Sequence, residues 1–282
     1  MAIRILALGD IVGRPGRQVV CNHLPALVRQ RQIDLVVANA ENIAGGSGIT
    51  PNLFAKIRSY GVDVVTLGDH ALRKAEIAQT LNTSERIVRP ANFSSLAPGK
   101  TYTVVTTASG VQVAVFAVMG RIYMNLPTDD PFAACEGVLN DLSPKVKVKV
   151  CDVHAEASSE KIALTHWLDG RCSLVFGTHT HIPTADARVT AQGTAAISDV
   201  GMTGPYDSVL GRRKDRILHH MTTALPTPFD VATNDVRMCG VLAEIDETTG
   251  KALTVERIEV LGGNVDQAYD EDDRGAAAKG KN

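Results

Sequence analysis

Short apolar runs alternate with helix-like stretches along most of this 282-residue chain. The apolar runs lie at residues 3–8, 34–38, 62–67 and 172–176, and the helical patterns lie at 16–31, 51–60, 71–81 and 158–169. Continuous apolar runs of this length are typical of strands that are buried on both faces. Strands that alternate with helices build a sheet covered by helices, so the pattern predicts an α/β fold.

The remaining patterned segments predict further strands. Residues 101–105 and 111–118 are separated by a Ser-Gly turn, as in a β-hairpin, and 238–246 and 252–260 flank the turn-like sequence ETTGK. Residues 145–153 alternate basic and apolar side chains, which predicts a half-exposed strand. We also expect a strand within GTAAISDV, which follows the 172–176 run.

The helix at 51–60 has clear signals at both ends. Thr50 is suited to cap its N-terminus, Pro51 to occupy its first position, and Gly61 to end it. Because the chain has no internal repeat and no obvious linker, we expect one domain over residues 1–265. Residues 266–282 are charged, rich in alanine and glycine and without periodicity, so we expect a disordered C-terminal tail.

Composition limits the classes of partner. The formal net charge is −2 and the isoelectric point is about 6.4, which argues against a nucleic-acid-binding surface. No apolar stretch approaches the ~18 residues of a membrane span, and the N-terminus has no signal-peptide pattern. The five cysteines have no CxxC spacing, as expected for reduced thiols in the cytoplasm. We therefore expect a small-molecule substrate or a protein partner, with no membrane contact.

Polar residues interrupt the chain where five of the predicted strands end. They are Asp10, Glu41 with Asn42, Asp69 with His70, His154, and the histidines of GTHTH at 177–181, His179 and His181. In α/β sheets the carboxyl ends of the strands line the ligand crevice, so residues far apart in sequence can meet there. Imidazoles suit Zn, Fe, Mn or Ni, while carboxylates hold harder ions and can bridge two of them. The pattern predicts a site for two metal ions.

Each of these residues, taken alone, has a simpler interpretation. An aspartate after a first strand is often a turn residue, and a single histidine is more often a surface or core residue than a ligand. Five interruptions of suitable chemistry favour the metal site. Thr178 and Thr180 could orient the imidazoles, contact phosphate or only cap the strand. The other histidines, His23, His166, His219 and His220, do not follow predicted strands and receive the simpler interpretation.

Competing motifs are weak. GDIVGRPG does not fit GxGxxG, and AGGSG at 44–48 lacks the lysine of a phosphate-binding P-loop. No GxSxG nucleophile motif occurs. The glycine-rich loop at 44–48 is better explained by close backbone approach beside the site.

The chain resembles the bacterial YmdB-type family of 2′,3′-cyclic nucleotide phosphodiesterases, within the calcineurin-like metallophosphoesterases. The resemblance covers residues 3–260 and is carried by LALGDIVGRPGR, VVANAENIAGGSGIT, DVHAEASSEKIAL, GTHTHIPTADARV and SDVGMTGPYDSVLGR. It implies two facing mixed β-sheets flanked by helices, an αββα sandwich with the site at the edge of the sheets. It also implies a homo-oligomer and iron, manganese or a related ion such as zinc.

The resemblance also implies a role for each site residue. Asp10, Asn42 and His181 would hold one metal ion, Asp69, His154 and His179 would hold the other, and Glu41 would bridge them. His70 matches the catalytic histidine of the family. The implied reaction is hydrolysis of a 2′,3′-cyclic nucleotide to a nucleoside monophosphate by a metal-bridging hydroxide.

Two other functions use the same residues. A phosphoesterase of broader specificity would need the same ligands, and only a substrate assay separates it from the first. A regulatory protein whose metal site supports partner binding is of another class. If a Glu41→Ala variant lost turnover but kept the cellular phenotype, binding would be the function.

Asp69 departs from the family pattern, which has asparagine at this position. A carboxylate adds negative charge beside the metal, so it should retain the cation more tightly and raise the pKa of the attacking water. We therefore expect the Asp69→Asn variant to have its optimum at a lower pH than the native enzyme. The pH dependence of kcat/KM checks this, and an optimum that stays in place or moves upward contradicts it.

Overall fold

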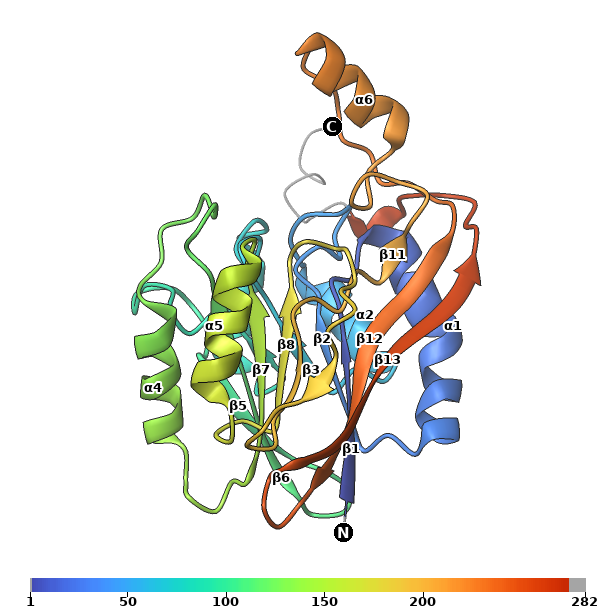
Figure 1. Ribbon diagram of the computed structural model, residues 1–282. Helices are drawn as coiled ribbons and strands as arrows, with labels where there is room; N and C mark the ends of the chain where they lie inside the picture. Colours follow the sequence, from blue (N-terminus) through green and yellow to red (C-terminus); the bar gives the residue numbers. More distant parts are fainter. Residues whose placement is uncertain (1, 274–282) are drawn as a thin grey trace.

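The computed structural model describes residues 2–273, which form two β-sheets that face each other between outer layers of helices (Figure 1). The first sheet has the order β11 (Gly204–Pro205), β12 (Val236–Asp246), β1 (Ala2–Leu8), β2 (Leu35–Asn39), β3 (Val64–Thr66) and β4 (Ile87–Val88), with β13 (Ala252–Gly263) paired to β12. The second has the order β5 (Tyr102–Thr106), β6 (Gln112–Met119), β7 (Val148–His154), β8 (Leu174–Thr178), β10 (Ala195–Ile197) and β9 (Arg188–Val189). Both sheets are mixed. The expected architecture is confirmed.

Alternation along the central strands creates the layers. In β1, Ile5 and Ala7 face the core between the sheets, whereas Leu6 and Leu8 pack towards the helices. In β6, Val115 belongs to the inter-sheet core and the next residue, Phe116, to the outer one. Because successive side chains of a strand point to opposite faces, a wholly apolar strand supplies two cores at once.

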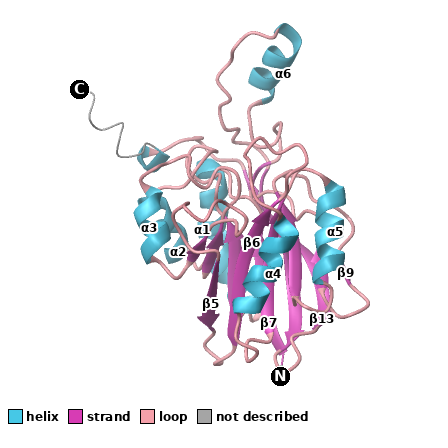
Figure 2. Cartoon of the chain, turned by 90° about the vertical axis from the view of Figure 1, so that its left-hand side faces the viewer, coloured by secondary structure: helices cyan, strands magenta, loops and turns pink. Residues whose placement is uncertain are grey.

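The helices cover the two outer faces. On the first sheet lie α1 (Gly13–Arg31), α2 (Pro51–Ser59) and α3 (Ile77–Thr83), and on the second lie α4 (Pro131–Asp141) and α5 (Ser158–Leu168). In Figure 1, α4 and α5 stand on the left and α1 on the right. The last helix, α6 (Lys214–Thr223), projects beyond the sandwich in both views (Figures 1 and 2).

Several local predictions are confirmed. Thr50 caps α2 by accepting a hydrogen bond from the Leu53 amide at 3.2 Å, and Pro51 is the first helical residue. Gly61 has a φ of 107°, a left-handed conformation that favours glycine after a helix end. Both predicted hairpins are present as β5–β6 and β12–β13.

Two predicted elements differ. The helix expected at 71–81 starts only at Ile77, because the preceding residues form turns that carry Asp69 and His70 towards the first sheet. The strand expected to be half-exposed at 145–153 is β7, which is buried from Val150 onward. It lies between β6 and β8 and is covered on both faces. The alternation of basic and apolar residues therefore describes only the start of the strand.

The C-terminal segment is described as far as Asp273, and residues 274–282 of the expected tail lie outside the described part. Residues 266–273 contact the body of the protein. The Arg17 guanidinium, buried on α1, donates to Asp270 at 2.6 Å and to Asp273 at 2.7 Å. Asp273 also accepts from the Gly45 amide at 2.8 Å. These contacts hold the segment against the glycine-rich loop 44–48, which follows Glu41 and Asn42.

No helix within residues 2–273 has the length and apolar character needed to cross a bilayer. All five cysteines are free thiols, of which Cys21 is exposed and the others are buried.

Candidate metal centre

The residues predicted as ligands follow the carboxyl ends of five strands. Asp10 follows β1, Glu41 and Asn42 follow β2, Asp69 and His70 follow β3, His154 ends β7, and His179 and His181 follow β8. The first three strands belong to one sheet and the last two to the other. Parallel pairing of β1 with β2, β2 with β3, and β7 with β8 brings these ends to one edge of the sandwich.

Four of the predicted residues form one compact group. Glu41, Asp69, His154 and His179 each offer a donor atom, and these atoms all lie within 4.8 Å of one another. The His154 Nε2 atom lies 3.0 Å from Asp69 Oδ1 and 3.3 Å from Glu41 Oε1. The His179 Nδ1 atom lies 3.1 Å from His154 Nε2.

Three further predicted residues form a second group. The Asn42 side-chain amide lies 3.4 Å from Asp10 Oδ1 and 3.3 Å from His181 Nε2. His181 Nε2 lies 3.6 Å from Asp10 Oδ1. The Asn42 amide also lies 3.4 Å from Glu41 Oε1. Glu41 therefore contacts both groups, the position expected of a bridging carboxylate.

The GTHTH turn places its two histidines through a strained backbone. His179 and His181 have φ angles of 94° and 65°, which non-glycine residues rarely adopt. Asp199 holds the turn by accepting from the Thr180 hydroxyl at 2.7 Å and from its amide at 3.2 Å. The buried Lys161 ammonium donates to the same Asp199 oxygen at 2.6 Å. Thr180 therefore helps to hold the GTHTH turn in place through its contacts with Asp199.

Thr178 orients His154. Its hydroxyl lies 2.9 Å from His154 Nδ1 and donates to Asp152 Oδ1 at 2.7 Å. Asp152 is fully buried, and burial raises its pKa to about 6 despite hydrogen bonds from Thr66 and Thr178. This chain of contacts fixes the imidazole with Nε2 towards Glu41 and Asp69, as outer partners do for metal-bound histidines.

The other two histidines have outer partners as well. The His181 Nδ1 atom lies 3.1 Å from the Leu210 carbonyl oxygen, which leaves Nε2 facing Asp10. The His179 Nε2 atom lies 3.2 Å from the half-exposed Glu156 carboxylate, which leaves Nδ1 facing the cluster. Each imidazole therefore has one nitrogen held by the protein and one directed into the site.

The carboxylates of this centre stabilise positive charge within it. Burial alone would lower the pKa of His154, but Glu41, Asp69 and Asp10 raise it well above its ordinary value. Burial by itself would raise the pKa of Asp69 and of Asp10. Contacts with His154 and His179 nevertheless hold the pKa of Asp69 below its ordinary value. Contact with His181 lowers the pKa of Asp10 in the same way. A cluster of oxygen and nitrogen donors with this preference fits Mn, Fe or Zn ions.

His70 lies at the edge of the cluster rather than within it. Its Nδ1 atom lies 2.7 Å from Asn42 Oδ1, and its amide donates to Glu41 Oε2 at 3.1 Å. The side chain is 26% exposed, and together with Asp69 it borders a cavity of about 410 Å³. It is therefore the predicted site residue best placed to meet a molecule that binds in this cavity.

Sequence reasoning missed several residues that support the centre. Asp152 interrupts an apolar run and could have been noticed, but Lys161, Asp199 and Glu156 are joined to the histidines only by the fold. Of the four histidines given the simpler interpretation, His23 lies on α1, His166 on α5, and His219 and His220 on α6. None of them belongs to the described metal-binding cluster.

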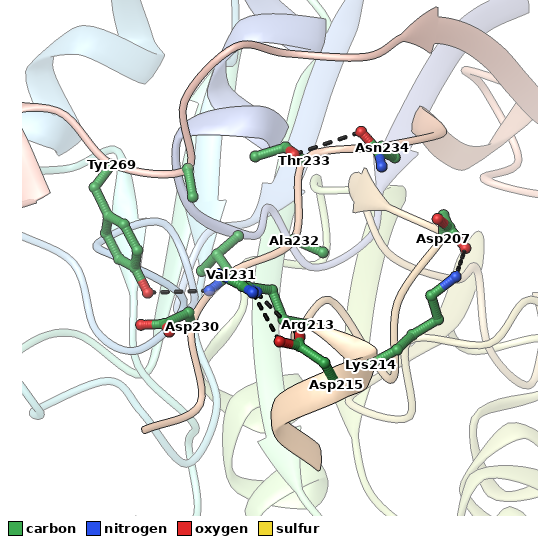
Figure 3. Close-up of a pocket in the computed structure, with 11 residues that line it drawn as sticks. Asp207, Arg213, Lys214, Asp215, Asp230, Val231, Ala232, Thr233, Asn234 and Tyr269 are labelled. Atoms are coloured by element: carbon green, nitrogen blue, oxygen red, sulfur yellow. Dashed lines mark hydrogen bonds and ion pairs between the residues drawn. The ribbon is translucent and has the colours of Figure 1, made fainter. Parts of the chain in front are cut away.

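A second cavity, of about 510 Å³, lies at the base of α6 and contains no predicted ligand (Figure 3). Four of its charged groups pair with each other, Arg213 with Asp215 at 2.7 Å and Lys214 with Asp207, while Asp230 lies 3.5 Å from Arg216. The Tyr269 hydroxyl accepts from the Val231 amide at 3.0 Å. The Lys214–Asp207 pair joins the start of α6 to the loop before it, and we assign the cavity no catalytic role.

Comparison with known proteins gives consistent matches over nearly the whole chain. The family model described as "YmdB-like protein" matches residues 6–258. A 2′,3′-cyclic-nucleotide 2′-phosphodiesterase from Bacillus subtilis is 41% identical over 256 residues, which cover 91% of this chain and 96% of that protein.

Two solved structures have the same fold. A hypothetical protein from Thermus thermophilus is 39% identical with a TM-score of 0.85, over 92% of this chain and 99% of that one. A protein from Mycoplasma pneumoniae described as a novel phosphatase is 31% identical with a TM-score of 0.87, over 94% of this chain and 95% of that one.

Proposed function

This chain belongs to the YmdB-like family, and on that premise we propose that it is a phosphodiesterase that opens the ring of 2′,3′-cyclic nucleotides. The observation that carries the proposal is the joint cluster around Glu41, where carboxylates and imidazoles from both sheets meet beside a cavity. Such a donor set holds cations that neutralise a phosphate. The identity of the Bacillus relative supports the cyclic nucleotide as substrate.

We propose that the centre binds two metal ions, iron or manganese, with zinc as an alternative occupant. Asp10, Asn42 and His181 would hold one ion. Asp69, His154 and His179 would hold the other, and Glu41 would bridge them. The contacts of Glu41 with both groups support this division. When bound, the ions supply positive charge to the phosphate oxygens and make water more acidic.

The residues around the cations position and protonate the substrate. In the reaction, a bond forms between a water oxygen and phosphorus, the bond from phosphorus to one ribose oxygen breaks, and the water releases one proton to the solvent. The proton needed by that ribose oxygen comes from His70, whose imidazole borders the cavity. Asn42 accepts from His70 Nδ1 through its Oδ1 atom, which fixes the imidazole beside the cavity. The product is a nucleoside monophosphate.

A substrate panel on metal-reconstituted protein tests this function. We expect kcat/KM to be highest for 2′,3′-cyclic AMP and much lower for 3′,5′-cyclic AMP and an aryl phosphodiester, because the strained five-membered ring opens most readily. Chelation should abolish turnover, and Mn or Fe should restore it. Preference for the aryl diester would instead support a phosphoesterase of broad specificity.

We further propose that the protein is a homo-oligomer and that α6 carries a contact between copies. This helix stands apart from the sandwich (Figure 2) and exposes Leu218 and Met221 by 57% and 73%, and Leu225, two residues beyond its end, is 55% exposed. A helix of 10 residues is marginal by itself in water, and its exposed apolar residues favour packing against another surface. Packing α6 against its own copy across a twofold axis would cover both sets of side chains.

Charge placed on this helix should dissociate the oligomer. We expect a Leu218→Glu/Met221→Glu variant to have the mass of a smaller species than the native protein by light scattering, because two desolvated carboxylates would face the partner. Exposed Leu253 on β13 offers the matched control Leu253→Glu, which should leave the mass unchanged. A native protein that is monomeric, or a variant of unchanged mass, contradicts the proposal.

Two broader assignments complete the proposal. We propose that residues 1–265 act as one domain, supported by the pairing of the C-terminal strands β12 and β13 with each other and of β12 with the N-terminal strand β1. We also propose a cytoplasmic location, in keeping with cysteines that are free thiols.

A further inference from the structure

The cavity beside His70 is lined partly by side chains that the binding of a phosphate group alone would not require. It shares Asp69 and His70 with the metal centre and is otherwise lined by Leu72, Arg73, Phe93, Asn125 and Leu126. Leu72 and Leu126 are 38% and 39% exposed. Apolar side chains exposed in a cavity next to a reaction centre are typical of a site that a ligand covers.

The walls come from three loops, and hydrogen bonds hold two of them, the loop of Phe93 and the loop of Asn125 and Leu126. The Asn92 side chain accepts from the Met119 amide at 2.8 Å and donates to the carbonyls of Met119 at 2.7 Å and Asp129 at 3.0 Å. It therefore joins the loop that carries Phe93 to both ends of the loop that carries Asn125 and Leu126. The Glu160 carboxylate further holds the second loop by accepting from the Arg121 and Ile122 amides at 2.9 and 3.0 Å.

The chemistry of the walls matches a heterocyclic base. A nucleobase has two apolar faces and a polar edge. Leu72, Phe93 and Leu126 can cover a face, while Asn125 and Arg73 supply hydrogen-bond donors for the edge, and Asn125 an acceptor as well. A cyclic phosphate alone would use the charged centre and leave these leucines in water. The volume of about 410 Å³ is within the range of small-molecule sites.

We propose that this cavity is the nucleobase subsite of the enzyme, with Leu72 and Leu126 as specificity-determining residues. The inference rests on the proposed function, since a base in the cavity places the attached ribose phosphate beside His70 and Asp69. Recognition by apolar contact favours nucleotides over cyclic phosphates that lack a base.

Two substrates with the same ring separate this inference from the function itself. Glycerol 1,2-cyclic phosphate has the five-membered cyclic diester and no base. We expect the native enzyme to hydrolyse 2′,3′-cyclic AMP with a kcat/KM about 10- to 100-fold higher, the range for apolar contacts in a specificity pocket. Hydrolysis of neither compound would overturn the proposed function, whereas equal kcat/KM values for both would overturn only the subsite.

Leucine variants test the residues. We expect Leu72→Ala and Leu126→Ala each to reduce the ratio of the two kcat/KM values about tenfold, mainly through a higher KM for the nucleotide. Leu96, on the same loop as Phe93 but 93% exposed and outside the cavity wall, provides the control Leu96→Ala with an unchanged ratio. If the cavity variants keep the native ratio of the two kcat/KM values, the assignment of the cavity as a nucleobase subsite is wrong.

A binding measurement gives a readout without catalysis. Adenosine lacks phosphate, so it should bind through the base alone and shift the methyl resonances of Leu72 and Leu126 in an NMR titration. The Leu96 methyl resonances should stay in place. Shifts confined to other residues would contradict the assignment.

Discussion

Replacement of Glu41 by alanine is expected to remove bound metal and to lower kcat by at least about 10³-fold, beyond the 10- to 100-fold typical of outer partners. Glu41 is fully buried and contacts both halves of the centre, through His154 Nε2 at 3.3 Å and the Asn42 amide at 3.4 Å. Without its charge, the repulsion between two bound cations would be less compensated. Elemental analysis of the purified variant, together with its turnover, measures the effect.

Glu156 provides the matched control for this variant. Its carboxylate contacts the outer nitrogen of His179 at 3.2 Å, but the side chain is half-exposed and belongs to neither ligand group. Glu156→Ala should therefore cost only about 10- to 100-fold in metal affinity. If Glu41→Ala retained two metal ions per chain, the bridging role would be wrong, even if activity fell.

That these polar residues would lie together could be predicted from the sequence, because a local signal marks each one. His154 ends an apolar strand, and Asp10 and Glu41 come two residues after the last residue of theirs, and the carboxyl ends of such strands meet at one edge of a sheet. The signal is strong because a polar side chain there interrupts an otherwise buried run. The two-sheet architecture came from the resemblance, since alternation alone does not say how strands divide between sheets.

What could not be predicted depends on tertiary contacts. The Lys161–Asp199 pair supports the GTHTH turn, but its members are 38 residues apart and neither carries a local signal of that role. The late start of α3 at Ile77 has a similar cause, because the turns before it are held by the contact of His70 with Glu41. Tertiary contacts here override local propensity.

Two helices were missed for different reasons. For α4 a signal existed: Asp130 caps the helix by accepting from the Phe132 amide at 2.8 Å, and Pro131 is its first residue. For α6 only Ile217 is buried, whereas Leu218 and Met221 are exposed, so contacts within the described chain explain little of its apolar pattern. The cavity beside His70 is a related case, since only the folded loops bring Leu72 and Leu126 together.

Replacement of His70 by alanine is expected to lower kcat about 10²- to 10⁴-fold, the range for general acid–base catalysis, while the metal content stays unchanged. The imidazole borders the cavity and contacts Asn42 Oδ1 at 2.7 Å, but it lies outside the group of donor atoms around His154. It can therefore deliver a proton to the leaving ribose oxygen without being needed to hold a cation. Single-turnover kinetics and elemental analysis on the same preparation measure both quantities, with His166→Ala on α5 as a control that should match the native enzyme. Loss of metal from His70→Ala would make His70 a ligand, and an unchanged kcat would assign the proton to another donor.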